Sequence, residues 1–128
     1  MMERTIRIKA GEVELEARLN DTDTATAIWE ALPFTSRLNT WGDEVYFAIP
    51  VRLGLERGQE LVEVGDLGYW PSGCAFCIFF GPTLLSRGRE IRPASAVTVF
   101  GKVVGDATVL KGVKSGTEVT VNRKTAAA

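Results

Sequence analysis

Histidine is absent from the 128-residue sequence. It is the side chain that most often serves as a general base and as a metal ligand, so a Ser-His-Asp triad is excluded and a zinc site is effectively excluded. The glycines also form neither of the phosphate-binding patterns G-x-x-x-x-G-K-S/T and G-x-G-x-x-G. We therefore expect no metal, no cofactor and no nucleotide site.

An excess of charge of either sign is also missing, because 15 basic and 16 acidic residues give a net charge of −1. Such a chain has no electrostatic attraction for nucleic acid or for an anionic membrane, so neither is expected as a partner. The first residues carry charges at Glu3, Arg4 and Arg7 and contain no apolar run typical of a secretory signal. This pattern favours a cytoplasmic protein.

Cysteine is scarce, and its two copies, Cys74 and Cys77, form a C-x-x-C pattern. In redox proteins this pattern opens a helix, whereas here it continues into IFFGP, which is typical of a strand. Thiols three residues apart on a strand point to opposite faces and cannot bridge without distortion. We expect two small buried core residues rather than a redox site.

Charge is missing altogether from residues 67–86, LGYWPSGCAFCIFFGPTLLS. The stretch is long enough to cross a membrane, but its glycines and prolines would break a spanning helix several times. Only residues 74–80 are apolar without interruption. A short apolar run between turn signals predicts a strand that is covered on both faces, and no membrane span.

The rest of the chain alternates apolar and polar residues, as strands do. Residues 5–10 and 13–19 predict a hairpin, and further strand-like runs cover 44–51, 60–64, 67–70, 96–104 and 117–121. The period changes to that of an amphipathic helix at 21–32, where Asp21 or Thr22 is the candidate N-cap. A shorter helix is expected near 106–112.

About eight strands in one domain predict a mainly β fold, a closed antiparallel eight-stranded barrel, because closure removes exposed edges. Within residues 1–128 we expect an ordered core of about 5–121 and a tail at 122–128.

Three motifs carry a family resemblance: WGDEVYFAIPV (41–51), VGDLGYWPSG (64–73) and CIFFGPT (77–83). In this order they resemble the short prokaryotic cyclophilin-like family, and TVFGKVVGDATVLKGV (98–113) is similar to a segment of true cyclophilins. The resemblance implies a cyclophilin-like barrel closed at its ends by helices.

The resemblance does not carry prolyl isomerase activity across intact. Cyclophilins have an arginine in an F-H-R-x-I-P strand, and matching the shared Ile-Pro to VYFAIP puts Phe47 at the arginine's position. The catalytic residues are therefore unknown. Arg37, beside the motif strand, is the one candidate for a replacement cation, and a surface ion pair is the alternative interpretation.

The resemblance also implies a working groove on the outside of the barrel, since the interior of a small barrel is filled with side chains. The predicted ligand-binding residues are aromatic: Tyr46, Phe47, Trp70, Phe76 and Phe79. Trp41 and Phe80 belong to the same set of aromatic residues, all of which are alternatively plain core. We expect the loop at 84–95 to cover the groove with Leu84 and Leu85. Asp43 and Glu44 are either paired carboxylates or, as favoured here, acids that face water.

Three functions follow as hypotheses. The first is a binding module that holds a proline-containing extended peptide or a small apolar ligand and performs no chemistry. The second is a peptidyl-prolyl isomerase with a non-standard site. The third, which rests on fold analogy alone, is a subunit-like domain in a system that hydrolyses small amides. The absence of the arginine favours the first, and the oligomeric state stays open.

Overall fold

The computed structural model describes residues 4–124. These residues form nine strands, one α-helix and two short 3-10 helices. In chain order the elements are β1 (Thr5–Ala10), β2 (Val13–Leu19), α1 (Asp23–Ala31), β3 (Phe34–Arg37), β4 (Asn39–Thr40), β5 (Glu44–Ala48), β6 (Asp66–Trp70), η1 (Pro71–Gly73), β7 (Ala75–Phe79), β8 (Thr98–Val104), η2 (Ala107–Leu110) and β9 (Glu118–Arg123).

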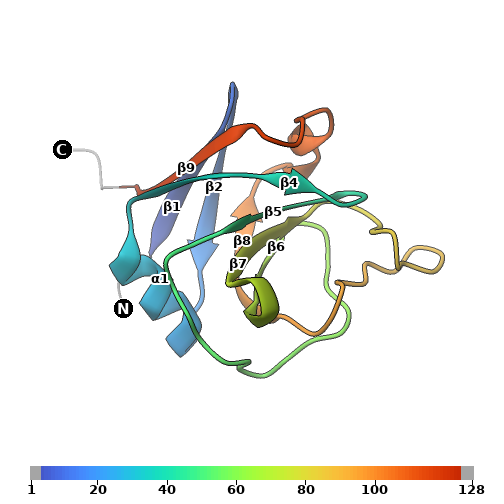
Figure 1. Ribbon diagram of the computed structural model, residues 1–128, viewed down its shortest axis with the longest axis horizontal. Coiled ribbons are helices and arrows are strands. Elements are labelled where there is room, and N and C mark those ends of the chain that lie inside the picture. The colour runs from blue at the N-terminus through green and yellow to red at the C-terminus, as the bar shows by residue number, and fades with distance from the viewer. Residues whose placement is uncertain (1–3, 125–128) are drawn as a thin grey trace.

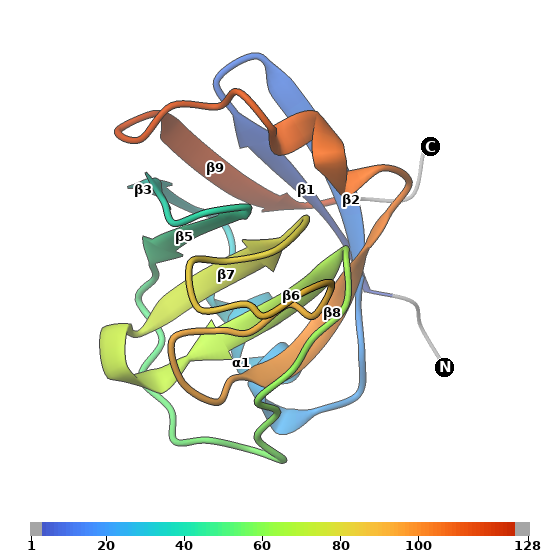
Figure 2. The same ribbon diagram turned by 90° about the vertical axis from the view of Figure 1, so that its right-hand side faces the viewer.

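All nine strands belong to one sheet, in the order β3-β9-β1-β2-β8-β6-β7-β5-β4, and every pairing is antiparallel. The two end strands, β3 and β4, are neighbours in the chain and are separated only by Leu38. The sheet therefore curls round until its ends meet, which gives a nearly closed barrel (Figures 1 and 2). The predicted fold class is confirmed, with nine strands in place of eight.

The predicted strands differ from the observed ones in three places. The strand predicted at 44–51 ends earlier, at Ala48 in β5. Residues 60–64 form no strand, because Gln59 and Val62 each make only a single bridge, to Val97 and Ile91. The short strands β3 and β4 were not predicted, since their sequences, FTSR and NT, contain no alternation of apolar residues. They form because β9 and β5 offer them pairing partners from elsewhere in the chain.

The predicted hairpin is confirmed as β1 and β2, with Ala10 opposite Val13. The helix at 21–32 is confirmed as α1, and the Thr22 hydroxyl caps it by accepting a hydrogen bond from the Ala25 N–H at 3.1 Å. The expected helix at 106–112 is shorter, a 3-10 turn at Ala107–Leu110 capped by Asp106. α1 and η2 lie at opposite ends of the barrel (Figures 1 and 2).

The strands of the described residues begin at Thr5, in β1. β9 continues to Arg123, two residues beyond the predicted end of the core at 121. Residues 125–128 of the predicted tail lie outside the described residues, as do residues 1–3. In the part of the chain between residues 4 and 124, no helix has the length and apolar character needed to span a membrane.

The strand β7 shows why its sequence is apolar throughout. Phe76 and Ile78 point into the barrel and join the main core, while Ala75, Cys77 and Phe79 lie on the outer face in a second apolar cluster. Both faces of β7 are therefore covered, as predicted. Loop residues Val62, Ile91 and Val97 supply the outer cover.

Both cysteines are free. Cys77 is buried on the outer face of β7, but Cys74 is only half-buried and precedes the strand in a left-handed conformation with φ of 46°. The expectation of two core cysteines is therefore correct only for Cys77.

Candidate functional site

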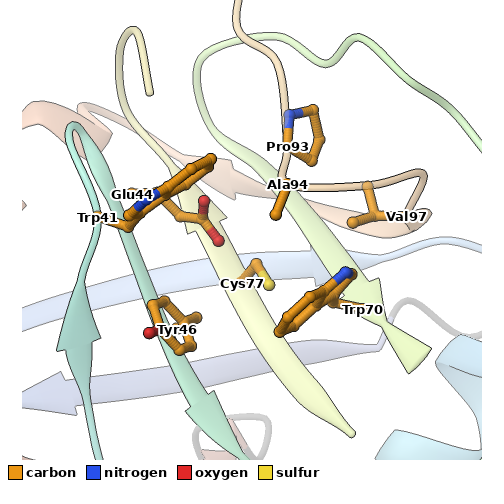
Figure 3. Close-up of a pocket in the computed structure, with 8 residues that line it drawn as sticks. All are labelled: Trp41, Glu44, Tyr46, Trp70, Cys77, Pro93, Ala94 and Val97. Carbon is orange, nitrogen blue, oxygen red and sulfur yellow. The ribbon is translucent and has the colours of Figure 1, made fainter. Parts of the chain in front are cut away.

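A cavity of about 210 Å³ lies on the outer face of the barrel, over β5, β6 and β7 (Figure 3). Strand alternation decides which side chains reach it. On β5, Val45 and Phe47 point into the barrel, so Glu44 and Tyr46 point out. The cavity, called the outer pocket below, is lined by Trp41, Glu44, Tyr46, Trp70, Cys77, Pro93, Ala94 and Val97.

A tight turn at residues 41–44 positions the first side of the outer pocket. The Trp41 N–H donates to the Glu44 carbonyl oxygen at 2.9 Å. Gly42 sits in the turn with φ of 61°, and a Cβ atom there would lie 2.9 Å from the Cα of Thr83. The turn thus packs backbone against backbone, which holds Trp41 and Glu44 at the entry to β5.

The loop between β7 and β8 forms the opposite wall and is held by internal hydrogen bonds. The Thr83 hydroxyl donates to the Arg92 carbonyl oxygen. The Ser86 hydroxyl oxygen accepts from the backbone N–H groups of Thr83, at 2.8 Å, and Arg92, at 3.1 Å. Pro93 and Ala94 follow directly and line the pocket. These bonds indicate that the wall is a built feature of the fold.

The same loop fixes one of the two indole rings. The indole N–H of Trp70 donates to the Ser95 hydroxyl at 2.6 Å. In the view of Figure 3 the carboxylate of Glu44 and the sulfur of Cys77 lie between the rings of Trp41 and Trp70. Tyr46 stands beside them on the side of β5. The pocket is therefore mostly apolar and aromatic, with one acid in it.

Glu44 is the single charged residue in the lining of the outer pocket. The residue is 5 % exposed, and among the described residues it forms no ion pair. Burial raises the pKa of its carboxyl from 4.5 to about 7, partly offset by an interaction with the Cys77 thiol. Burial, with the nearby Glu44 charge, also raises the pKa of the Cys77 thiol. Glu44 thus changes charge near neutral pH, and Cys77 is not an activated nucleophile.

Of the five predicted ligand-binding residues, the structure brings two together in the outer pocket, Tyr46 and Trp70. Phe79 lies on the outer face but is fully covered in the second cluster. The predicted outward placement of Phe47 and Phe76 is wrong. Both are 0 % exposed inside the barrel, where their rings stack with centroids 4.8 Å apart.

The placement of Arg37 as a replacement cation in the groove is also wrong. Its guanidinium donates to the Gly116 carbonyl oxygen at 3.0 Å, in the segment before β9, and does not line the outer pocket. Leu84 and Leu85 do not cover the groove either, since they are 71 % and 48 % exposed. The loop does lie over this face, but it contributes Pro93 and Ala94 instead.

The most informative lining residue that the sequence interpretation missed is Glu44, which was expected to face water. Its position in the strand could have shown this. Residues 44 and 46 share one face of a strand, and Tyr46 was already placed in the groove. Trp41 belonged to the aromatic set without being selected. Pro93 and Ala94 lie in the loop that was expected to cover the groove, but Leu84 and Leu85 were selected from it instead. Val97 was expected in a strand and was not assigned to the groove.

The fold and the pocket together define a small antiparallel barrel of the cyclophilin type, with its cavity on the outside. The family model for Cyclophilin-like proteins matches residues 4–122, and the chain belongs to this family. It is similar to a hypothetical protein from Archaeoglobus fulgidus, known from a solution structure, with 42 % identity over 95 % of each chain and a TM-score of 0.82. Comparison with curated proteins gives no significant match.

Proposed function

We propose that this protein is a binding module that holds a small ligand, or one side chain of an extended peptide, in the outer pocket. The observation that carries the proposal is an open cavity on the face where the groove was expected, lined by Trp41, Tyr46 and Trp70. Ligand sites are concave and mostly apolar and contain a few oriented polar groups, and the outer pocket has this composition.

The size of the cavity supports a small occupant. Its 210 Å³ is below the roughly 300–1,000 Å³ that is usual for drug-sized ligands. A single proline ring or a comparable apolar group has a volume that fits this cavity, whereas a large cofactor is too big for it. The proposal therefore concerns one group of a ligand seated between the two indoles.

Catalysis of proline isomerisation is not part of the proposal. No lysine or arginine is among the residues that line the outer pocket, so no cation is available there to hold a substrate carbonyl. A standard isomerisation assay with a proline peptide should show little or no acceleration. Strong turnover would contradict this account. A role beside a small-amide hydrolase stays a prediction from fold analogy.

Nuclear magnetic resonance tests the binding proposal directly, because the chain has three tryptophans and only two lie in the pocket. We expect titration with the peptide Ala-Ala-Pro-Phe, or with the neutral alcohol 3,3-dimethyl-1-butanol, to shift the indole N–H signals of Trp41 and Trp70 first. Trp29, on α1, is the internal control and should not move. Shifts confined to the β1–β2 hairpin would place the site elsewhere and contradict the proposal.

A further inference from the structure

The outer pocket combines two features that together select a ligand class, namely aromatic rings and a buried acid without a basic partner. Glu44 forms no ion pair among the described residues, although it is almost fully buried. A buried carboxylate without a counter-ion is costly, so a cation that enters the pocket would be held by it.

The rings around Glu44 are not engaged with one another. The ring–ring contacts of the described residues all involve phenylalanines packed about Phe76. Trp29, the tryptophan outside the pocket, already carries a cation, since the guanidinium carbon of Arg123 lies 4.9 Å from its ring centroid. Among residues 4–124, Trp41 and Trp70 have no such internal cation and are open to one from outside.

The polar content of the lining distinguishes between kinds of cation. A bare ammonium or a guanidinium brings three to five N–H donors, each of which needs an acceptor once it is removed from water. Apart from Glu44 and the Tyr46 hydroxyl, the side chains of the lining offer no oxygen. An alkylated ammonium carries its charge under a layer of methyl groups and needs few acceptors, and aromatic faces attract it.

We propose that the outer pocket binds an alkylated ammonium group, with the rings of Trp41, Tyr46 and Trp70 around it and Glu44 as its counter-ion. This inference rests on the proposed binding function and narrows it to one chemical class. The group can belong to a free choline-like molecule or to a methylated lysine side chain. Its chemistry is the same in both cases.

The test compares choline with 3,3-dimethyl-1-butanol, its neutral isostere, in which a carbon atom replaces the quaternary nitrogen. The full chain carrying Trp29→Phe is used, so that intrinsic fluorescence reports only on Trp41 and Trp70. At pH 8 we expect saturable binding of choline that is at least about tenfold tighter than that of the isostere. A short peptide containing trimethyl-lysine forms a parallel arm. Whichever cation binds more tightly identifies the source of the group.

Glu44→Gln tests the counter-ion, because it removes the charge and keeps the shape. Choline affinity should fall about tenfold or more, while the affinity for the isostere stays unchanged. Glu14→Gln, at an exposed glutamate of β2, should change neither. If Glu44→Gln leaves choline binding intact, the assignment of Glu44 is overturned.

The pH dependence supplies a second readout. Choline binding should weaken as the pH falls from 8 to 5.5, because Glu44 becomes protonated, and the isostere should show no such change. Tyr46 and Cys77 are the other titratable groups in the lining. Asp43 packs against Gly81 in the adjoining turn, and Arg92 pairs with Glu90 at 2.8 Å in the loop. The Glu44→Gln variant separates their effects, since it should abolish the pH dependence.

The outcomes separate the two proposals. If the isostere binds as tightly as choline or more tightly, the cation inference is overturned and the binding function stands. If neither of these probes binds, and neither does the trimethyl-lysine peptide or the proline peptide, both proposals fail. Charge-dependent binding to Trp41 and Trp70 supports both.

Discussion

Of the two buried acids among the described residues, Asp66 pairs with Lys102 and Glu44 has no basic partner. It lies in an apolar lining on the outer face of the barrel, where burial raises its pKa from 4.5 to about 7. At a pH between 4.5 and about 7, Glu44 keeps its proton in the folded protein and loses it in the unfolded chain. Unfolding therefore releases a proton, so the contribution of Glu44 to stability declines as the pH rises from about 4.5 to about 7.

This linkage predicts the stability of Glu44→Gln. At pH 4.5 the variant and the wild type should be about equally stable, because both side chains are neutral in the folded state. At pH 8 the variant should be more stable by up to about 3 kcal/mol, the free energy that corresponds to a pKa change from 4.5 to about 7. Urea unfolding at the two pH values measures the difference.

The control for this measurement is Glu14→Gln, at an exposed strand position. Its effect on the free energy of unfolding should be small and should not grow with pH. If Glu44→Gln is destabilising at pH 8, the carboxylate makes favourable contacts there, and the account of a buried acid that lacks a counter-ion is wrong.

At the scale of the elements, the turn at residues 41–44 holds one wall of the outer pocket through a close backbone contact. Gly42→Ala should destabilise the protein by about 2–4 kcal/mol, because alanine is strained at positive φ and its Cβ would meet the Thr83 backbone. Gly88→Ala is a matched control in the loop after β7, since φ is 62° there and nothing lies within 4 Å of the added atom. It should cost only about 1 kcal/mol.

Thermal or urea unfolding of the two variants measures this difference. Because both glycines have nearly the same φ, any excess in Gly42→Ala reports the contact with Thr83 and not the backbone conformation alone. Equal costs for the two variants would show that the turn and the loop do not support each other.

Elements whose own sequence carries a periodic pattern could be predicted, and those that depend on a partner could not. The β1–β2 hairpin and α1 have clear periods of two and 3.6 residues. β3 and β4 contain mostly polar residues and owe their extended form to β9 and β5. The apolar pattern at 60–64 is real, but Val62 serves to cover Phe79 and does not extend a ladder.

A periodic pattern within the segment itself also decides which site residues could be predicted. On β5 the charged Glu44 marks one face, and alternation then assigns Tyr46 to that face and Phe47 to the opposite one. On β7 all five residues are apolar, so no residue distinguishes the core face from the outer face. The sequence alone could not decide the direction of Phe76. The wall made by Pro93 and Ala94 depends on long-range folding of a loop.

At the scale of the whole molecule, the barrel wall separates two apolar regions with different roles. Inside, Phe76 packs edge to face with Phe100 and stacks on Phe47, and this core closes the barrel. Outside, Tyr46 and Trp70 border the second cluster and the outer pocket. The strands β5 and β7 each contribute to both regions through alternate residues. Stability and ligand binding should therefore respond to different substitutions.

Phe76→Leu and Trp70→Phe test this separation. Phe76→Leu loses ring contacts in the core and should lower the free energy of unfolding by about 1–3 kcal/mol. The affinity of this variant for 3,3-dimethyl-1-butanol should stay within about twofold of the wild type, since no atom of the pocket lining is removed. Trp70→Phe should weaken binding and change the free energy of unfolding little. The residue is only partly buried, and its indole N–H bonds to Ser95 at the pocket wall. Unfolding in urea and fluorescence or resonance titration give the two quantities for each variant. If Phe76→Leu weakens binding as much as Trp70→Phe does, the wall of the barrel transmits changes in core packing to the outer pocket, and the two regions are not independent.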